Sequence, residues 1–240
     1  MFNIVGQRER ASLVTAGKIF RLMERLEIGT IAAKLKDFKK EDEFAEDNTK
    51  TTLITEIRDL TIRANMLHGD YVQDQIVYIS HHGERRPIPR TLEIPFVFVQ
   101  EKERTLLLVI ERKLLANNIA NRLSEALFIT PGYITETRIS AEALRDFHEK
   151  NPEDTKVIFF DNVDIPNINK LSLYGSGLLN TALYNDYLKH GTIWYVVMTA
   201  LKYESVIGIT RGAIVTVFNS IDRDDYVRYV TNEIFPIIEP

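Results

Sequence analysis

The segment 111–113, with the sequence ERK, holds the residues whose types and spacing are best suited to chemistry. It follows the apolar run 106–110, which predicts a strand that ends at the acid. A carboxylate is a ligand that hard cations such as Mg²⁺ prefer, and the lysine two residues later adds a positive charge. Such a site needs a second acid on a neighbouring strand, and Glu93 and Asp70 are available.

This pattern of acid, spacer and lysine resembles the E-x-K half of the PD-(D/E)xK nucleases. The resemblance implies a Mg²⁺-dependent nuclease in which Glu111 binds the metal and Lys113 assists the water. The pattern is short, and strands often end in charged residues because they leave the core there. The corresponding place in the second half of the chain reads NSI at 219–221, so a working site would be confined to the first half. We keep this nuclease as the alternative and expect the chain not to be an enzyme.

The segment 81–90, with the sequence HHGERRPIPR, is the densest positive cluster in the chain. Its glycine and two prolines predict an exposed loop, because proline cannot donate a hydrogen bond to a strand ladder. Arginine presents fork-like donors that suit phosphate or carboxylate groups. We therefore expect a positive face that binds nucleic acid or another anion. Its predicted residues are Arg85, Arg86, Arg90, Arg104, Arg112 and Lys113.

Other kinds of site find little support in the sequence. The chain has no cysteine, which excludes disulfides, thiolate metal sites and cysteine nucleophiles. None of the five histidines is paired at the spacing of a helical zinc motif. The glycine-containing segment 175–177 precedes a helical pattern and is interpreted as a helix-start turn. We therefore predict no metal and no cofactor.

Composition favours a globular chain with a real core. Its 240 residues are 45% apolar, and the net charge of −4 argues against a surface coated in basic charge, although a local basic face remains compatible with it. No run reaches the roughly 18 to 20 apolar residues that a membrane span needs. The N-terminus lacks the uninterrupted apolar core of a signal peptide. We expect a cytoplasmic protein without membrane contact.

The elements that would position these residues follow from the apolar pattern. Residues 92–129 predict a strand, a turn, a second strand and a helix. Towards the N-terminus the pattern predicts a helix at 9–26, a weak strand at 30–38 and a charged surface loop at 39–50. In the C-terminal half we expect further elements: strands at 156–163, 170–174 and 192–201, a hairpin at 206–218, and helices at 140–150, 178–188 and 222–234.

The segments 105–129 and 213–237 align without a gap, and Val109 then falls on Val217. This indicates an internal duplication. We predict an α+β fold of two similar halves, 1–130 and 131–240, each an antiparallel sheet with a helix packed on one face. The halves would be related by pseudo-twofold symmetry.

Taken together, these patterns favour a non-catalytic binding or regulatory protein that contacts nucleic acid through the segment 81–90. Two alternatives remain open. One is the Mg²⁺-dependent nuclease, and the other is a protein–protein scaffold without nucleic-acid contact. Unpaired sheet edges would also favour a homodimer.

Overall fold

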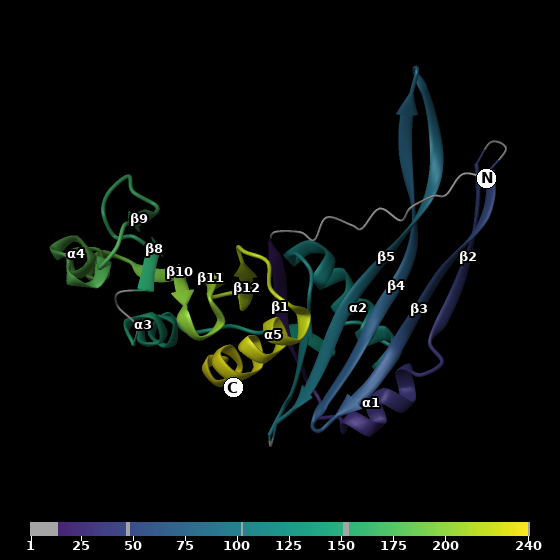
Figure 1. Cartoon of the computed structure of the whole chain (residues 1–240), viewed down its shortest axis with the longest axis horizontal. Helices are drawn as coiled ribbons and strands as arrows, with labels where there is room; N and C mark the ends of the chain where they lie inside the picture. The colour runs from purple at the N-terminus through teal and green to yellow at the C-terminus, as the bar shows by residue number, and fades with distance from the viewer. Residues whose placement is uncertain (1–13, 47–48, 102, 151–153, 240) are drawn as a thin grey trace. The chain divides into compact units, whose positions relative to one another are not determined.

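The computed structural model describes residues 14–46, 49–101, 103–150 and 154–239 (Figure 1). These residues form two compact units, which are described separately. The N-terminal unit comprises residues 17–136, and the C-terminal unit comprises residues 137–239 together with 14–16. Each unit combines an antiparallel sheet with helices, which confirms the α+β class. The division between the units falls after Glu136.

The N-terminal unit is built on a sheet in the order β2-β3-β4-β5-β6-β1, and β7 pairs with β1. Every pairing in it is antiparallel. The strands are β1 Thr15–Leu22, β2 Lys39–Glu46, β3 Thr49–Arg63, β4 Met66–His81, β5 Glu84–Gln100, β6 Thr105–Val109 and β7 Ile134–Glu136. The helices are α1 Ile28–Leu35 and α2 Lys113–Phe128.

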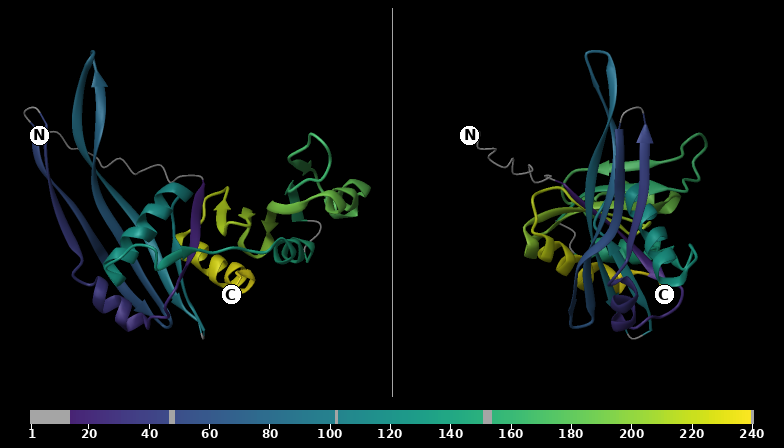
Figure 2. Two further views of the ribbon diagram at one scale, coloured as in Figure 1. Left: turned by 180° about the vertical axis from the view of Figure 1, so that it is seen from behind. Right: turned by 90° about the vertical axis from the view of Figure 1, so that its right-hand side faces the viewer.

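Both helices cover the same face of this sheet (Figure 2). Phe96 and Phe98 of β5 point to that face, and they pack in one core with Ile119 and Leu123 of α2 and Leu35 of α1. Their neighbours on β5 are buried as well, so β5 is apolar on both sides. The strand, turn, strand and helix predicted for residues 92–129 are therefore confirmed as β5, β6 and α2.

Three sequence predictions near the N-terminus are wrong. The helix expected at 9–26 is the strand β1 over its described part, and residues 9–13 lie outside the described residues. Ile19 and Phe20 are adjacent and both buried, because β1 is covered on both faces, and such a run imitates a helical pattern. The strand expected at 30–38 is the helix α1.

The charged loop expected at 39–50 is instead β2 and the start of β3. β2 forms the edge of the sheet and carries the sequence KKEDEFAE, and most of its side chains are exposed. Exposed pairs along it, such as Lys39 and Glu41 at 2.7 Å, keep the edge strongly charged. Charges on an edge strand discourage pairing with another chain, which explains why a strand carries a loop-like composition.

The C-terminal unit has a sheet in the order β12-β11-β10-β8-β9. Its strands are β8 Thr155–Asp161, β9 Leu171–Tyr174, β10 Thr192–Ala200, β11 Ser205–Thr210 and β12 Ile214–Val217. The α-helices are α3 Ala141–Glu149, α4 Ala182–His190 and α5 Arg223–Tyr229. A π-helical turn, Val230–Ile234, and a 3-10 turn, Phe235–Ile237, continue from α5.

The sequence predicted this unit well because its elements carry local signals. Ser140 was expected to begin a helix, and its hydroxyl accepts a hydrogen bond from the Ala143 N–H at 2.9 Å. The buried strand expected at 192–201 is β10, and the hairpin after it is β11 and β12. None of the helices among the described residues combines the length and apolar character needed to cross a membrane.

Candidate functional site

The most distinctive feature of the N-terminal unit is the long hairpin formed by β4 and β5. Their register is uniform from Met66 opposite Val99 to His81 opposite Glu84. The neighbouring ladders stop earlier, since β3 reaches only to Gln73 of β4 and β6 only to Phe96 of β5. Residues 75–91 therefore form a two-stranded projection, which we call the arm (Figure 1).

The arm corrects the prediction that residues 81–90 form a loop. Only His82 and Gly83 lie outside the strands, and both have positive φ, 50° and 83°. A two-residue turn with two positive φ values matches the right-handed twist of the flanking strands. The remaining residues of the segment belong to β4 or β5, and the whole segment is largely exposed.

Pro87 and Pro89 fit into β5 because their backbone nitrogens point away from β4, the strand with which β5 pairs along the arm. The Pro95 carbonyl accepts a hydrogen bond from the Ile110 N–H at 2.9 Å, so alternate residues of β5 face the β6 side. The uniform register carries this alternation to Pro87 and Pro89, where β6 has ended. The missing N–H groups therefore cost the β4–β5 ladder nothing, and they weaken this edge as a template for another strand.

One face of the arm combines an aromatic ring with an arginine. Tyr78 and Pro87 lie opposite each other, and the Arg85 guanidinium lies 4.0 Å from the centroid of the Tyr78 ring. Tyr78 is 42% exposed, so this cation–π pair is available to a partner. The Tyr78 hydroxyl donates to the Glu46 carboxylate at 2.5 Å, which links the arm to the end of β2.

The opposite face mixes arginines with apolar side chains. Ile79 lies opposite Arg86, and Ile79 and Ile88 are 49% and 41% exposed. Arg90 follows on the same face, opposite Gln75. The exposed Arg86 carries an ion pair with Glu84 at 2.5 Å, which is worth little in water and can be exchanged for another anion.

The arm is positive although the chain as a whole is acidic. Residues 75–91 contain three arginines and one glutamate, a net charge of +2, whereas the whole chain carries −4. The rest of the chain therefore carries −6 with histidines neutral. The net charge of the arm is therefore opposite in sign to that of the rest of the chain.

The structure does not bring all six predicted basic residues together. Arg104 lies in the turn after the far end of β5, where its Nε donates to Glu101 at 2.6 Å. At about 3.3 Å per residue, the strand alone separates it from Arg85 by roughly 50 Å. Arg112 and Lys113 lie at the start of α2, after β6. Of the two strands of the hairpin, β6 pairs only with residues 96–100 of β5, at its base. The arm thus contains Arg85, Arg86 and Arg90 alone.

The acids of the predicted nuclease site are also only partly assembled. Asp70 and Glu93 lie on adjacent strands, and their carboxylate oxygens lie within 4.8 Å of one another and of Asp59. Asp70 is buried, whereas Asp59 and Glu93 are exposed. Three such carboxylates can ligate a hard cation. Glu111 is not a member of this group, and its carboxylate accepts a hydrogen bond from the Arg112 N–H at 2.8 Å.

Sequence reasoning missed Asp59 and underestimated Tyr78. Asp59 reaches the acid group because β3 has an irregularity between Arg58 and Thr61, where its own φ is 54°. A bulge of this kind has no signal in the sequence. Tyr78 was not singled out as a site residue, because aromatic side chains within a strand pattern more often belong to the core. Tyr78 is only three residues from His81, where the hairpin turn begins, and this short separation indicates that its side chain lies beyond the core.

Lys18 of β1 is a buried cation that the sequence did not single out. Its side chain is 1% exposed, and its Nζ donates to Glu136 at 2.5 Å and to Asn117 at 2.7 Å. Burial lowers the pKa of the Lys18 ammonium, and the hydrogen bond and charge of Glu136 oppose that shift. The hydrogen bond from Lys18 in turn lowers the pKa of the Glu136 carboxyl. These groups form a structural link between β1, β7 and α2.

Comparison with known proteins does not identify a family. No protein-family model matches the sequence, and no curated protein is significantly similar to it.

Proposed function

We propose that this chain is a non-catalytic nucleic-acid-binding protein and that the arm is its contact element. The observation that carries the proposal is the projecting β4–β5 ribbon, in which Arg85, Arg86 and Arg90 are displayed beyond the core of the unit. The major groove of a duplex admits a two-stranded ribbon. Arginine forks can reach the phosphates on either side of the groove.

The charge distribution supports contact through the arm rather than through the whole surface. Each phosphate that is neutralised contributes about −0.9 to the slope of log affinity against log salt. Three arginine contacts therefore predict a slope of about −2.7 and an affinity that falls about 40-fold between about 50 and 200 mM salt. A steeper slope would require cations outside the arm.

The test is a fluorescence-anisotropy titration of the full chain with labelled duplex and single-stranded DNA, with and without Mg²⁺. Arg85→Ala, Arg86→Ala and Arg90→Ala should each weaken duplex binding and reduce the salt slope by about 1. Arg122→Ala is the matched control, since Arg122 is an exposed arginine on α2 of the same unit, paired with Glu125. Equal losses in the control and the arm variants would contradict the proposal.

A protein–protein scaffold is the second candidate, and the exposed isoleucines of the arm favour it. Ile79 and Ile88 lie diagonally on one face, where they offer an apolar surface for another protein. The absence of nucleic-acid binding at low salt would leave this candidate. Ile79→Ser with Ile88→Ser should then abolish capture of the partner, whereas the arginine variants should not.

The Mg²⁺-dependent nuclease draws support from the group of Asp59, Asp70 and Glu93. Its weakness is Glu111, whose carboxylate is engaged by the backbone next to it. Cleavage of the labelled DNA that requires Mg²⁺ and disappears in Asp70→Asn or Glu111→Ala would contradict a non-catalytic role. DNA that remains intact under binding conditions supports it.

We also propose that the two units arose by duplication and that the protein is cytoplasmic. The aligned segments support the first point, because 105–129 contains β6 and α2 while 213–237 contains β12 and α5. Superposition of these segments should place Val109 on Val217 and Ile119 on Val227. The cysteine-free sequence supports a reducing compartment.

Homodimerisation also remains a prediction, and light scattering, which measures the mass of the protein in solution, tests it. The charged side chains of the edge strand β2 disfavour a dimer that pairs through that strand.

A further inference from the structure

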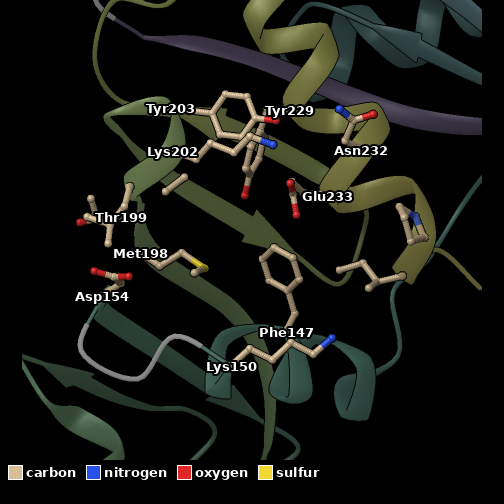
Figure 3. A pocket seen from close by; sticks show the side chains of 14 residues that line it. Phe147, Lys150, Asp154, Met198, Thr199, Lys202, Tyr203, Tyr229, Asn232 and Glu233 are labelled. Atoms are coloured by element: carbon tan, nitrogen blue, oxygen red, sulfur yellow. The ribbon is translucent and has the colours of Figure 1, made fainter.

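The C-terminal unit contains a cavity of about 450 Å³. It lies between α3, the end of β10, and the helical segment 223–237 (Figure 3). Phe147 and Met198 supply apolar side chains that point into it, and Tyr229 and Glu233 approach from the opposite side. Pockets for small molecules have volumes of roughly 300 to 1,000 Å³, so the size of this cavity suits a small ligand.

Two tyrosine hydroxyls in the lining lack a hydrogen bond. Tyr229 is 2% exposed, and neither its hydroxyl nor that of Tyr203 has a partner among the residues that the structure describes. The hydroxyl of Tyr229 and the carboxylate of Glu233 both point into the cavity (Figure 3). A buried hydroxyl without a partner is costly, so the arrangement calls for a polar group inside the cavity.

The protonation of this hydroxyl is settled by its surroundings. Burial raises the pKa of Tyr229, and the negative charge of Glu233 raises it further. The hydroxyl therefore stays protonated near neutral pH, where it can donate one hydrogen bond and accept another. Glu233 can only accept hydrogen bonds when ionised, and it forms no ion pair with any residue in the described part of the chain.

The charged side chains around the cavity are balanced. Lys150 and Lys202 are exposed cations at its rim, and Asp154 and Glu233 are the acids. Lys202 also lies 5.4 Å from the centroid of the Tyr203 ring. A ligand with a single charge would meet one pair of these groups and be repelled by the other. A ligand with both charges can satisfy an acid and a lysine at once.

We propose that this cavity binds a small zwitterion with an apolar body, of the class of free α-amino acids. The ligand ammonium donates to Glu233 and to the Tyr229 hydroxyl. Its carboxylate accepts from Lys202, which lies beside Tyr203 and Tyr229 at the rim (Figure 3). Its side chain packs against Phe147 and Met198. The site is independent of the arm, so the nucleic-acid proposal can fail without affecting it.

The experiment is calorimetric titration of the full chain with phenylalanine and leucine, alongside two analogues that each lack one charge. Phenethylamine has no carboxylate, and 3-phenylpropionate has no ammonium. Phenylalanine should bind about tenfold or more tightly than either analogue, because each analogue leaves a charged group of the cavity without a partner. Failure of both amino acids to bind at millimolar concentration would overturn the proposal, as would equal affinity for an analogue.

Variants separate ligand contact from a structural role. Glu233→Gln and Tyr229→Phe should each weaken phenylalanine binding about tenfold, while Tyr229→Phe leaves the melting temperature unchanged or raised. Glu204→Gln, at an exposed acid outside the lining, is the control and should bind normally. Unchanged affinity in both cavity variants would show that phenylalanine binds somewhere else on the protein, and that result refutes the site.

Discussion

At the scale of single residues, Lys18 shows how a buried charge depends on its partners. Its ammonium is buried and bonded to Glu136 and Asn117. Glu136→Ala should destabilise the protein by about 1 to 3 kcal/mol, a value reduced from that of a fully buried pair because Glu136 is half exposed. Lys18→Met should cost less, since it removes the buried charge together with the need for a partner. Urea denaturation measures both, and the reverse order would contradict this interpretation.

The same pair predicts acid sensitivity. The pKa of Glu136 is lower in the folded protein than in the unfolded chain, so its contribution to stability is complete above the unfolded value. That contribution is lost as the pH falls through the lower folded value. Unfolding midpoints measured between about pH 6 and 3 should therefore decline less in Glu136→Gln than in the parent. Identical declines would show that the pair is not linked to folding.

Tyr226 and Tyr229 form a natural comparison within one helix. The buried Tyr226 hydroxyl donates to the Val215 carbonyl at 2.9 Å, whereas the Tyr229 hydroxyl has no partner among the described residues. Tyr226→Phe should lower the free energy of unfolding by about 1 kcal/mol, and Tyr229→Phe should leave it unchanged or raise it by up to about 1 kcal/mol. Chemical denaturation tests the difference, and equal losses would indicate that Tyr229 is bonded within the protein.

At the scale of elements, the arm depends on Pro87 and Pro89 for a protected edge. Replacing both with valine restores N–H groups on the side of β5 that β6 leaves uncovered. The ladder with β4 should remain, while self-association increases because the edge now offers donors to another chain. Light scattering across a concentration series measures this. If the valine variant kept the mass of the parent but lost the β4–β5 hairpin, the prolines would instead be needed for the fold of the arm.

The sequence predicted an element correctly where its own residues carry a clear apolar pattern. Predictions were wrong where a strand pairs with strands that are distant in the sequence. Residues 92–129 carry two apolar runs and a helical stripe, and they form β5, β6 and α2 as expected. Within the arm, only the segment 81–90 was interpreted as a loop, because prolines are unusual inside a strand. β1 was mistaken for a helix because its neighbours in the sheet are far away in sequence.

The candidate site was predicted in the same uneven way. The three arginines of segment 81–90 were identified from their density alone. Their separation from Arg104 depends on the length of β5, which the sequence did not reveal. The meeting of Asp70 with Asp59 depends on a bulge, and the cavity beside Tyr229 depends on packing between elements distant in sequence. Such features arise from tertiary contacts and have no local pattern.

At the scale of the whole molecule, the arm carries a net charge of +2, whereas the remaining sequence carries −6. We therefore expect the attraction of a polyanion to be strongest at the arm. Affinity should therefore be modest and strongly salt-dependent, and an excess of cations at the arm should matter more than the net charge.

The most direct test is duplex binding by the parent and by the variant that combines Arg85→Ala, Arg86→Ala and Arg90→Ala, across a salt series. We expect the parent to bind with a log–log slope of about −2.7 and the triple variant to lose both affinity and most of the slope. The control Arg122→Ala should match the parent. Equal binding by the parent and the triple variant, or no binding by the parent at low salt, would contradict the arm as a nucleic-acid contact.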